Sequence, residues 1–209
     1  MKKYLVIGNP IEHSLSPKLH NYWIKQNNID AVYDKKKLHE DELEKIISEI
    51  RDEKIHGINV TTPFKKKIIS LVDKMTPIAE QAQSVNTVYK NNNKIIGDNT
   101  DIEGFEKSLN YINYDLQNKK VFILGSGGVA LSIILALKRK KVSQIYISNR
   151  TKKEPQNLKD KYSDLIIVDW GEICDFDLII NATSLGLNVD DSINLDFKNI
   201  KTKKLFYDV

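Results

Sequence analysis

Short apolar runs alternate along the chain with segments in which apolar residues recur at helical spacing. The runs expected to form strands are residues 4–7, 31–37, 55–60, 120–124, 144–148, 165–168, 177–181 and 204–209. Between most of them the apolar residues lie three and four positions apart, as at Leu43, Ile46, Ile47 and Ile50, which is typical of a helix with one buried face. Strands that alternate with helices predict an α/β fold with largely parallel sheets.

Three more helices are expected from the residues that commonly begin a helix. Ser16 before Pro17 has the character of an N-cap followed by proline at the first helical position. Thr62 and Pro63 predict a second helix start of the same kind. Thr100, with a glutamate three positions later, has the spacing of a capping box and begins a helix that reaches about residue 111.

We expect two domains, because the helix at residues 100–111 follows one group of strands and precedes another. The first domain would be residues 1–101, with a hairpin over the asparagines between residues 85–89 and 94–97, and the second would be residues 102–209. The last strand is apolar, and buried parallel strands need helices over both faces. Since the chain ends on that strand, we expect the second domain to be incomplete at its C-terminus.

Composition and charge exclude several classes of protein. Hydrophobic residues make up 41% and charged residues 29% of the chain, as in ordinary globular proteins. The net charge of +4 suits an anionic small molecule and is too small for a nucleic-acid-binding surface. With one cysteine, Cys174, no intrachain disulfide can form, and no secretory signal opens the chain, so we expect a cytoplasmic protein.

Membrane and metal sites are not expected either. The uncharged stretch at residues 121–137 is shorter than the roughly 20 residues of a spanning helix and is broken by three glycines. A strand, a tight turn and a buried helix account for it better. The four histidines show no ligand spacing such as H-E-x-x-H.

A glycine-rich turn joins that strand and helix. Its residues are Gly125, Ser126, Gly127, Gly128, Val129 and Ala130, which fit G-x-G-x-x-G/A between a strand and a helix. The first glycine would allow the sharp turn, the second would let a pyrophosphate approach the backbone, and the alanine would allow close helix packing. Free N–H groups at the helix start would then bind the phosphates. The structural alternative is a tight strand–helix connection without a ligand.

The end of the next strand favours NADP over NAD. NAD-binding sites usually place Asp or Glu about 20 residues beyond the glycines, where it binds the ribose 2′-hydroxyl. Here Ser148, Asn149, Arg150 and Thr151 are followed by two lysines, of which the first is Lys152. Arg150 could offer a planar fork to a 2′-phosphate. The lysines alone could equally be a solvated basic loop.

One residue of the first domain, Lys65, is a candidate for proton transfer. Lys65 would stand in the first turn of the helix expected at Pro63, where the helix dipole disfavours a cation. A nearby anion, either a substrate carboxylate or a partner aspartate, would relieve this. Asp101 suits the first turn of its helix, and a purely structural role is the alternative. Such a lysine is a candidate general acid or base.

Eight segments in their order and spacing resemble shikimate dehydrogenases. They are GNPIEHSLSP (8–17), NVTTPFK (59–65), VNT (85–87), GDNTDIEG (97–104), GSGGVA (125–130), NRT (149–151), NATSLG (181–186) and YDV (207–209). The resemblance covers the whole chain. The family usually continues for several dozen residues after YDV, which implies that this chain lacks the usual C-terminal segment.

The resemblance implies a fold, a reaction and a set of residues. The fold is an N-terminal α/β substrate-binding domain and a Rossmann-type NADP-binding domain with a parallel sheet. The reaction is the reversible reduction of 3-dehydroshikimate to shikimate by NADPH, in chorismate and aromatic amino acid biosynthesis, by a monomer or homodimer. The catalytic pair would be Lys65 and Asp101, and the other substrate-binding residues would be Ser14, Ser16, Asn59, Thr61 and Asn86. NADP(H) would be bound by Gly125, Ser126, Gly127, Gly128, Val129, Ala130, Asn149, Arg150, Thr151, Lys152, Thr183, Ser184, Leu185 and Gly186.

Two alternatives stay open at this point. A quinate/shikimate dehydrogenase would share the fold and the catalytic pair, would accept the extra hydroxyl of quinate and would often use NAD. The other alternative is a catalytically impaired fragment that only binds ligand. Intact Lys65 and Asp101 argue against it, and the expected missing segment argues for it.

Overall fold

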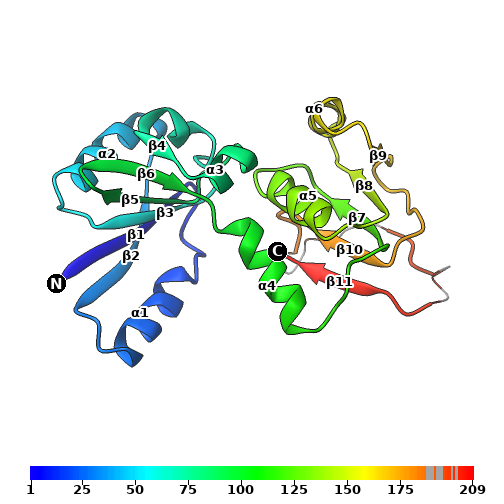
Figure 1. Cartoon of the computed structure of the whole chain (residues 1–209), viewed down its shortest axis with the longest axis horizontal. Helices are drawn as coiled ribbons and strands as arrows, with labels where there is room; N and C mark the ends of the chain where they lie inside the picture. Colours follow the sequence, from blue (N-terminus) through cyan, green and yellow to red (C-terminus); the bar gives the residue numbers. More distant parts are fainter. Residues whose placement is uncertain (187–190, 192–194, 199, 201) are drawn as a thin grey trace. The chain divides into compact units, whose positions relative to one another are not determined.

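The computed structural model describes residues 1–186, 191, 195–198, 200 and 202–209. It divides into two compact units, Met1–Asp101 and Ile102–Val209, whose elements are labelled in Figure 1. Both units alternate strands and helices, which confirms the predicted α/β class. Over the described residues, no helix has the length and apolar character needed to cross a bilayer.

The first unit contains a mixed sheet of six strands in the order β2-β1-β3-β5-β6-β4. The strands are β1 (Lys2–Gly8), β2 (Ala31–Lys37), β3 (Gly57–Val60), β4 (Lys74–Met75), β5 (Thr87–Asn91) and β6 (Lys94–Asp98). Strand β1 pairs in parallel with β2 and β3, whereas β5 runs antiparallel to both β3 and β6. The predicted hairpin is therefore confirmed. Its two turn residues, Asn92 and Asn93, both have positive φ, as a tight hairpin turn requires.

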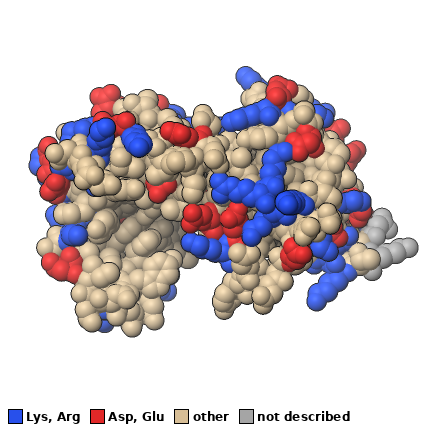
Figure 2. All heavy atoms as spheres, in the orientation of Figure 1, with Lys and Arg blue, Asp and Glu red and all other residues tan. Residues whose placement is uncertain are grey.

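Helices cover both faces of this sheet. They are α1 (Ser16–Gln26), α2 (Leu43–Arg51) and α3 (Pro77–Ala82), with short 3-10 helices η1 (Glu40–Glu42) and η2 (Lys67–Leu71). Adjacent residues of a strand point to opposite faces: Ile7 packs in the core that includes the apolar face of α2, and Val6 packs on the side of Ile24 of α1. The outward face of α1 leaves Tyr22 and Trp23 exposed, and the surface in this part of Figure 2 is mostly uncharged.

The second unit has an all-parallel sheet in the order β11-β10-β7-β8-β9. The strands are β7 (Lys120–Leu124), β8 (Gln144–Ser148), β9 (Leu165–Ile167), β10 (Leu178–Asn181) and β11 (Leu205–Asp208), and the helices are α4 (Asp101–Tyr111), α5 (Ala130–Arg139) and α6 (Lys153–Lys161). This order equals the first five strands of a doubly wound dinucleotide-binding sheet. The Rossmann-type prediction is therefore confirmed, as is the strand–turn–helix interpretation of residues 121–137.

The three predicted helix starts need correction. After Pro63 the chain forms hydrogen-bonded turns and then the 3-10 helix η2, so no α-helix begins there. Helix α1 includes Ser16 and its cap is Leu15, without a side-chain cap bond. The Thr100 capping box does not form, because the N–H of Thr100 donates to Asn86 instead of to a glutamate.

Candidate active site

An ion pair joins the two predicted catalytic residues of the first unit. Lys65 Nζ lies 2.8 Å from Asp101 Oδ2, and the two side chains are only 17% and 19% exposed. Lys65 stands in the turn before η2, where its carbonyl accepts a hydrogen bond from the N–H of Val85. The anion expected beside Lys65 is thus Asp101, although no helix dipole is involved. A mostly buried pair of this kind needs further hydrogen bonds to satisfy its remaining atoms.

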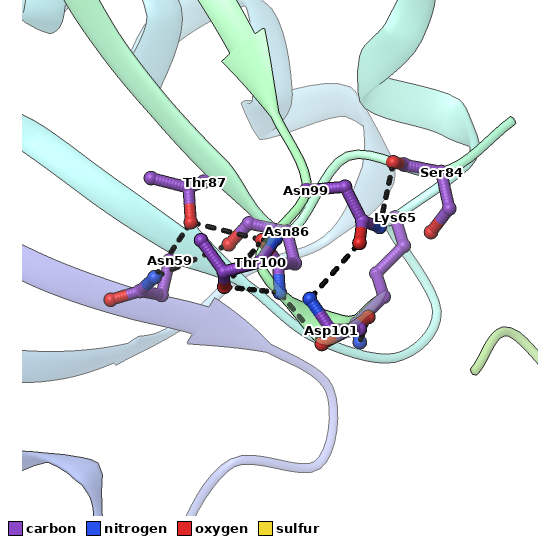
Figure 3. Close-up of polar contacts among 8 residues, drawn as sticks. All are labelled: Asn59, Lys65, Ser84, Asn86, Thr87, Asn99, Thr100 and Asp101. Atoms are coloured by element: carbon purple, nitrogen blue, oxygen red, sulfur yellow. Dashed lines mark hydrogen bonds and ion pairs between the residues drawn. The ribbon is translucent and has the colours of Figure 1, made fainter. Parts of the chain in front are cut away.

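Asn86 supplies those bonds from the loop before β5. Its Nδ2 donates to the second carboxylate oxygen of Asp101 at 2.7 Å and to Thr100 Oγ1 at 3.0 Å. Its Oδ1 accepts from the N–H of Thr100 and from the hydroxyl of Thr87. Figure 3 shows Asn86 between Thr100 and Asp101. Both amide hydrogens of Asn86 are used within the protein, so in this state the residue holds Asp101 in place.

Asn99 fixes the backbone at the start of α4. The residue is 2% exposed, and its side chain accepts from the N–H of Asp101 and donates to the carbonyl of Ser84. Asp101 is therefore held at two points: Asn99 binds its main-chain N–H, and Asn86 binds its carboxylate. Sequence reasoning did not identify Asn99 or Thr100 as site residues, although both lie in the segment 97–104 beside Asp101. Only the fold brings Asn99 to Ser84 and Thr100 to Asn86.

Asn59 belongs to the same group of polar residues. It lies on β3, where its Nδ2 donates to Thr87 Oγ1 at 3.1 Å and to the carbonyl of Asn86 at 3.3 Å. Its Oδ1 accepts a hydrogen bond of 2.6 Å from the hydroxyl of Tyr33 on β2. Tyr33 was also missed from sequence. The available signal was a lone aromatic residue at the centre of a strand that is otherwise polar toward its end.

The other predicted substrate-binding residues lie at the ends of neighbouring elements of the first unit. The side chain of Thr61 follows β3, and it stands so close to Gly8 that a Cβ there would lie 2.5 Å from the Thr61 methyl. Ser14 precedes α1, and its Oγ accepts from the N–H of Ser16 at 3.4 Å. Among the described contacts, no hydrogen bond joins these two serines to Lys65 or Asp101.

The glycine turn of the second unit lies between two neighbouring strands. Gly125 follows β7 with a φ of +100°, and a Cβ there would lie 2.7 Å from the carbonyl oxygen of Ala182, which follows β10. Strands β7 and β10 are adjacent in the sheet, at the point where the strand order reverses. Ligands of such sheets bind in the crevice at this switch point, outside the carboxyl ends of the strands.

This turn fits the phosphates of a dinucleotide. A Cβ built on Gly127 or Gly128 would meet no atom within 4 Å, so backbone can approach a ligand there. Within the described part of the chain, nothing accepts a hydrogen bond from the N–H groups of Gly127, Gly128 and Val129, which precede the N-terminus of α5. The buried hydroxyl of Ser126 likewise has no partner there. Free donors at a helix start are suited to an anion.

The loop after β8 holds the predicted 2′-phosphate residues. Asn149 is used structurally: its Oδ1 accepts from the N–H of Ser126 at 3.2 Å, and its Nδ2 donates to Thr151. Lys152 pairs with Asp169 at 2.8 Å, which raises the pKa of its ammonium. Arg150 is exposed and has no hydrogen bond or ion pair with any described residue. Its guanidinium is therefore available to a ligand.

One acidic residue near this loop was not considered from sequence. The hydroxyl of Thr151 donates to Glu154 in the first turn of α6, and this bond lowers the pKa of the Glu154 carboxyl. Glu154 thus faces Thr151 rather than standing at the end of β8, where an NAD-binding acid would be expected. The loop as a whole is less basic than its sequence suggested.

The segment after β10 is held by Asn181. Its Nδ2 donates to the carbonyl of Leu185 and to Asp208 of β11, and its Oδ1 accepts from the N–H and hydroxyl of Thr183. Gly186 turns the chain with a φ of +100°. The predicted residues Thr183, Ser184, Leu185 and Gly186 therefore form one tight turn beside Gly125.

Comparison with known proteins agrees with this geometry. The family described as the shikimate dehydrogenase substrate binding domain matches residues 6–88, and the family described as shikimate / quinate 5-dehydrogenase matches residues 106–208. A curated relative from Pelagibacter ubique, named shikimate dehydrogenase (NADP(+)), is 56% identical over 208 residues, which span all of this chain and 78% of that protein.

Solved structures give the same result. The crystal structure of shikimate dehydrogenase from Aquifex aeolicus superposes with a TM-score of 0.89 at 34% identity, covering 100% of this chain and 78% of that one. The Thermus thermophilus enzyme in complex with NADP(H) and shikimate superposes with a TM-score of 0.81 at 28% identity, covering 90% and 70%. Two family matches, a relative of high identity and a common fold lead to one conclusion: the chain belongs to the shikimate dehydrogenase family.

Proposed function

We propose that this chain catalyses the reversible, NADPH-dependent reduction of 3-dehydroshikimate to shikimate, the step that the relatives' name describes. The observation that carries the proposal is the Lys65–Asp101 pair, 2.8 Å apart and mostly buried, with its carboxylate held by Asn86. A fixed ammonium in a partly desolvated place can stabilise charge that develops on a carbonyl oxygen. The aromatic biosynthetic role follows from that reaction.

Lys65 would act on the oxygen of the ketone that is reduced. When bound, NADPH supplies the hydride that reduces the carbonyl carbon. Lys65 donates its proton to the carbonyl oxygen, which becomes the hydroxyl of shikimate, and it regains a proton from solvent. Asp101 keeps the ammonium in position and balances its charge. In the reverse direction Lys65 accepts the proton of the hydroxyl.

The remaining substrate contacts are divided between two parts of the first unit. Ser14 and Ser16, at the start of α1, would bind the carboxylate of the substrate. Asn59, Thr61 and Asn86 would surround the ring hydroxyls, together with Asp101. Support comes from the shared network that already contains Asn59, Asn86 and Asp101. Asn86 would exchange one of its internal hydrogen bonds for a substrate contact.

NADP(H) would be held mainly by backbone groups and one arginine. The N–H groups of Gly127, Gly128 and Val129 and the hydroxyl of Ser126 would bind the pyrophosphate, with Gly125 and Ala130 shaping the turn. Arg150 would bind the 2′-phosphate, while Asn149, Thr151 and Lys152 keep its loop in place through their internal contacts. Thr183, Ser184, Leu185 and Gly186 would border the nicotinamide. We propose the cytoplasm as the compartment of this protein, and a monomer or homodimer as its assembly.

A quinate/shikimate dehydrogenase is the second candidate, because the family matched by the second unit carries both names. The test is oxidation of shikimate and of quinate by this chain, each with NADP⁺ and with NAD⁺, followed by the absorbance of reduced nicotinamide. We expect turnover with shikimate and NADP⁺ to exceed the other three combinations. Preference for quinate would establish the second candidate, and calorimetric binding of shikimate without any turnover would identify a chain that only binds ligand.

A further inference from the structure

Tyr33 is a buried residue of β2 whose side chain reaches the candidate active site through Asn59. It is 5% exposed, and two neighbouring residues of α1 hold it. The ring of His20 stacks on its ring at 4.2 Å with an interplanar angle of 8°. The side chain of Asn21 pairs with its main chain, accepting from its N–H at 3.0 Å and donating to its carbonyl. Tyr33 lies on the edge strand β2, so Asn21 satisfies backbone groups that no strand would pair.

The hydroxyl of Tyr33 ends on Asn59 Oδ1 at 2.6 Å, and the direction of that hydrogen bond can be deduced. The other end of the Asn59 amide faces the carbonyl of Asn86, which can only accept. Nδ2 must therefore point to Asn86 and Oδ1 to Tyr33, so Tyr33 must donate. Burial raises the pKa of the Tyr33 hydroxyl, which keeps the donor proton in place. In Figure 3 the oxygen of Asn59 points away from Thr87 and Asn86.

This arrangement leaves only hydrogen-bond acceptors at two oxygens, Asn59 Oδ1 and the Tyr33 hydroxyl oxygen, which together are called the Asn59 corner. Both amide hydrogens of Asn59 are used by Asn86 and Thr87, and the Tyr33 proton is used by Asn59. A second lone pair remains on Asn59 Oδ1 and on the phenol oxygen. A ligand hydroxyl can donate to this corner, whereas a ketone, which only accepts, finds no partner. The ammonium of Lys65, in contrast, is a donor that suits a ketone.

We propose that Tyr33 is a positioning residue: Asn86 and Thr87 set the direction of the Asn59 amide, and Tyr33, by donating to its oxygen, holds that side chain in place, so that the remaining lone pair accepts a ring hydroxyl of the substrate and the ketone is directed to Lys65. The inference deepens the proposed function and rests on it. Tyr33 would act through Asn59 without taking part in proton transfer.

The test is Tyr33→Phe, which keeps the ring, its stacking on His20 and the main-chain contacts with Asn21. Loss of one hydrogen bond that fixes a binding group should raise KM for 3-dehydroshikimate about tenfold and change kcat by less than about threefold, because ground state and transition state lose it equally. KM for NADPH should stay unchanged. Tyr22→Phe, on the exposed face of α1, is the matched control and should change neither constant.

A double-mutant cycle shows whether Tyr33 acts through Asn59. If it does, Tyr33→Phe should have little further effect on KM once Asn59→Ala is present. Additive effects, or a lowered melting temperature with unchanged KM, would overturn the inference and leave the proposed function intact. If the wild-type chain shows no turnover, it and the same variants are compared by calorimetric titration with shikimate. An unchanged chain that neither turns over nor binds shikimate would overturn the proposed function, and this inference with it.

Discussion

The two units build their sites from different material. In the first unit, side chains hold side chains: Lys65, Asp101 and Asn86 form one hydrogen-bonded group, and Asn59 joins it through Thr87. In the second unit, the glycine turn is mostly backbone, and its free donors are N–H groups. A catalytic proton must be placed on one atom, and that requires fixed side chains. A phosphate needs several hydrogen-bond donors and must come close to the backbone, and glycines allow this because they have no Cβ atom.

The difference predicts how each site responds to substitution. A buried polar network fails when one member is removed, because its partners are left unsatisfied. A backbone cradle tolerates changes of side chain in its neighbourhood and is sensitive to added atoms. Substitution of Lys65 in the first unit should therefore change kcat, and added atoms on the open side of the glycine turn of the second unit should change the affinity for the cofactor.

The largest effect is expected for Lys65→Ala. Removal of the proton donor should lower kcat by about 10²–10⁴-fold, while calorimetry should find NADPH affinity unchanged, since the residue belongs to the other unit. Lys66→Ala, at the exposed neighbouring position, is the control and should leave kcat within about twofold. If kcat of Lys65→Ala were unchanged, Lys65 would have no part in the reaction. A parallel loss of NADPH affinity would mean that the two sites are not separable.

The second effect is expected for Arg150→Ala. Hydrogen bonds to a charged group contribute about 1.5–3 kcal/mol, so KM for NADPH should rise roughly 10- to 100-fold. KM for NADH, which lacks the 2′-phosphate, should change by less than about threefold, and kcat should stay the same with both. Lys153→Ala, at the first residue of α6, serves as the control for loss of a neighbouring positive charge. Equal losses for the two cofactors would assign the phosphate to other residues.

The fold was largely predictable because its signals are local. Apolar runs identified the strands, and the glycine turn was recognised from its place between a strand and a helix. The helix start at Pro63 was predicted wrongly, because proline begins turns as well as helices, and here the chain forms turns. The Thr100 capping box failed because Asn86, distant in sequence, takes the N–H that the box would use.

The candidate site was predictable only in part. The motifs identified Lys65, Asp101 and Asn86, but they did not show that Asn86 holds the carboxylate of Asp101. Tyr33 lies in no motif, and it matters only through Asn59, which is distant in sequence. Asn99 lies in the segment 97–104, but its contact with Ser84 is made only by the fold. Ion pairs between residues distant in sequence could not be predicted either. Lys152 was predicted to bind a phosphate, but in the fold it pairs with Asp169.

The smallest effect is expected from two glycines of the same turn, which separate fold from binding. Gly125→Ala places a Cβ 2.7 Å from the Ala182 carbonyl at a φ of +100°, so the free energy of unfolding should fall by roughly 1–3 kcal/mol. Gly127→Ala meets nothing within 4 Å, so its melting temperature should not change. Calorimetry should nevertheless find its NADPH affinity reduced about tenfold, because the methyl occupies space that the pyrophosphate needs.

Gly104→Ala, in the middle of α4 and also free of contacts within 4 Å, is the control for the loss of a glycine, and it should leave NADPH affinity unchanged. The two turn positions should therefore fail in opposite assays, one in stability and the other in binding. If Gly127→Ala kept full affinity, the pyrophosphate would not lie against this backbone. The contrast between a site built of side chains and a site built of main chain would then hold only for the first unit.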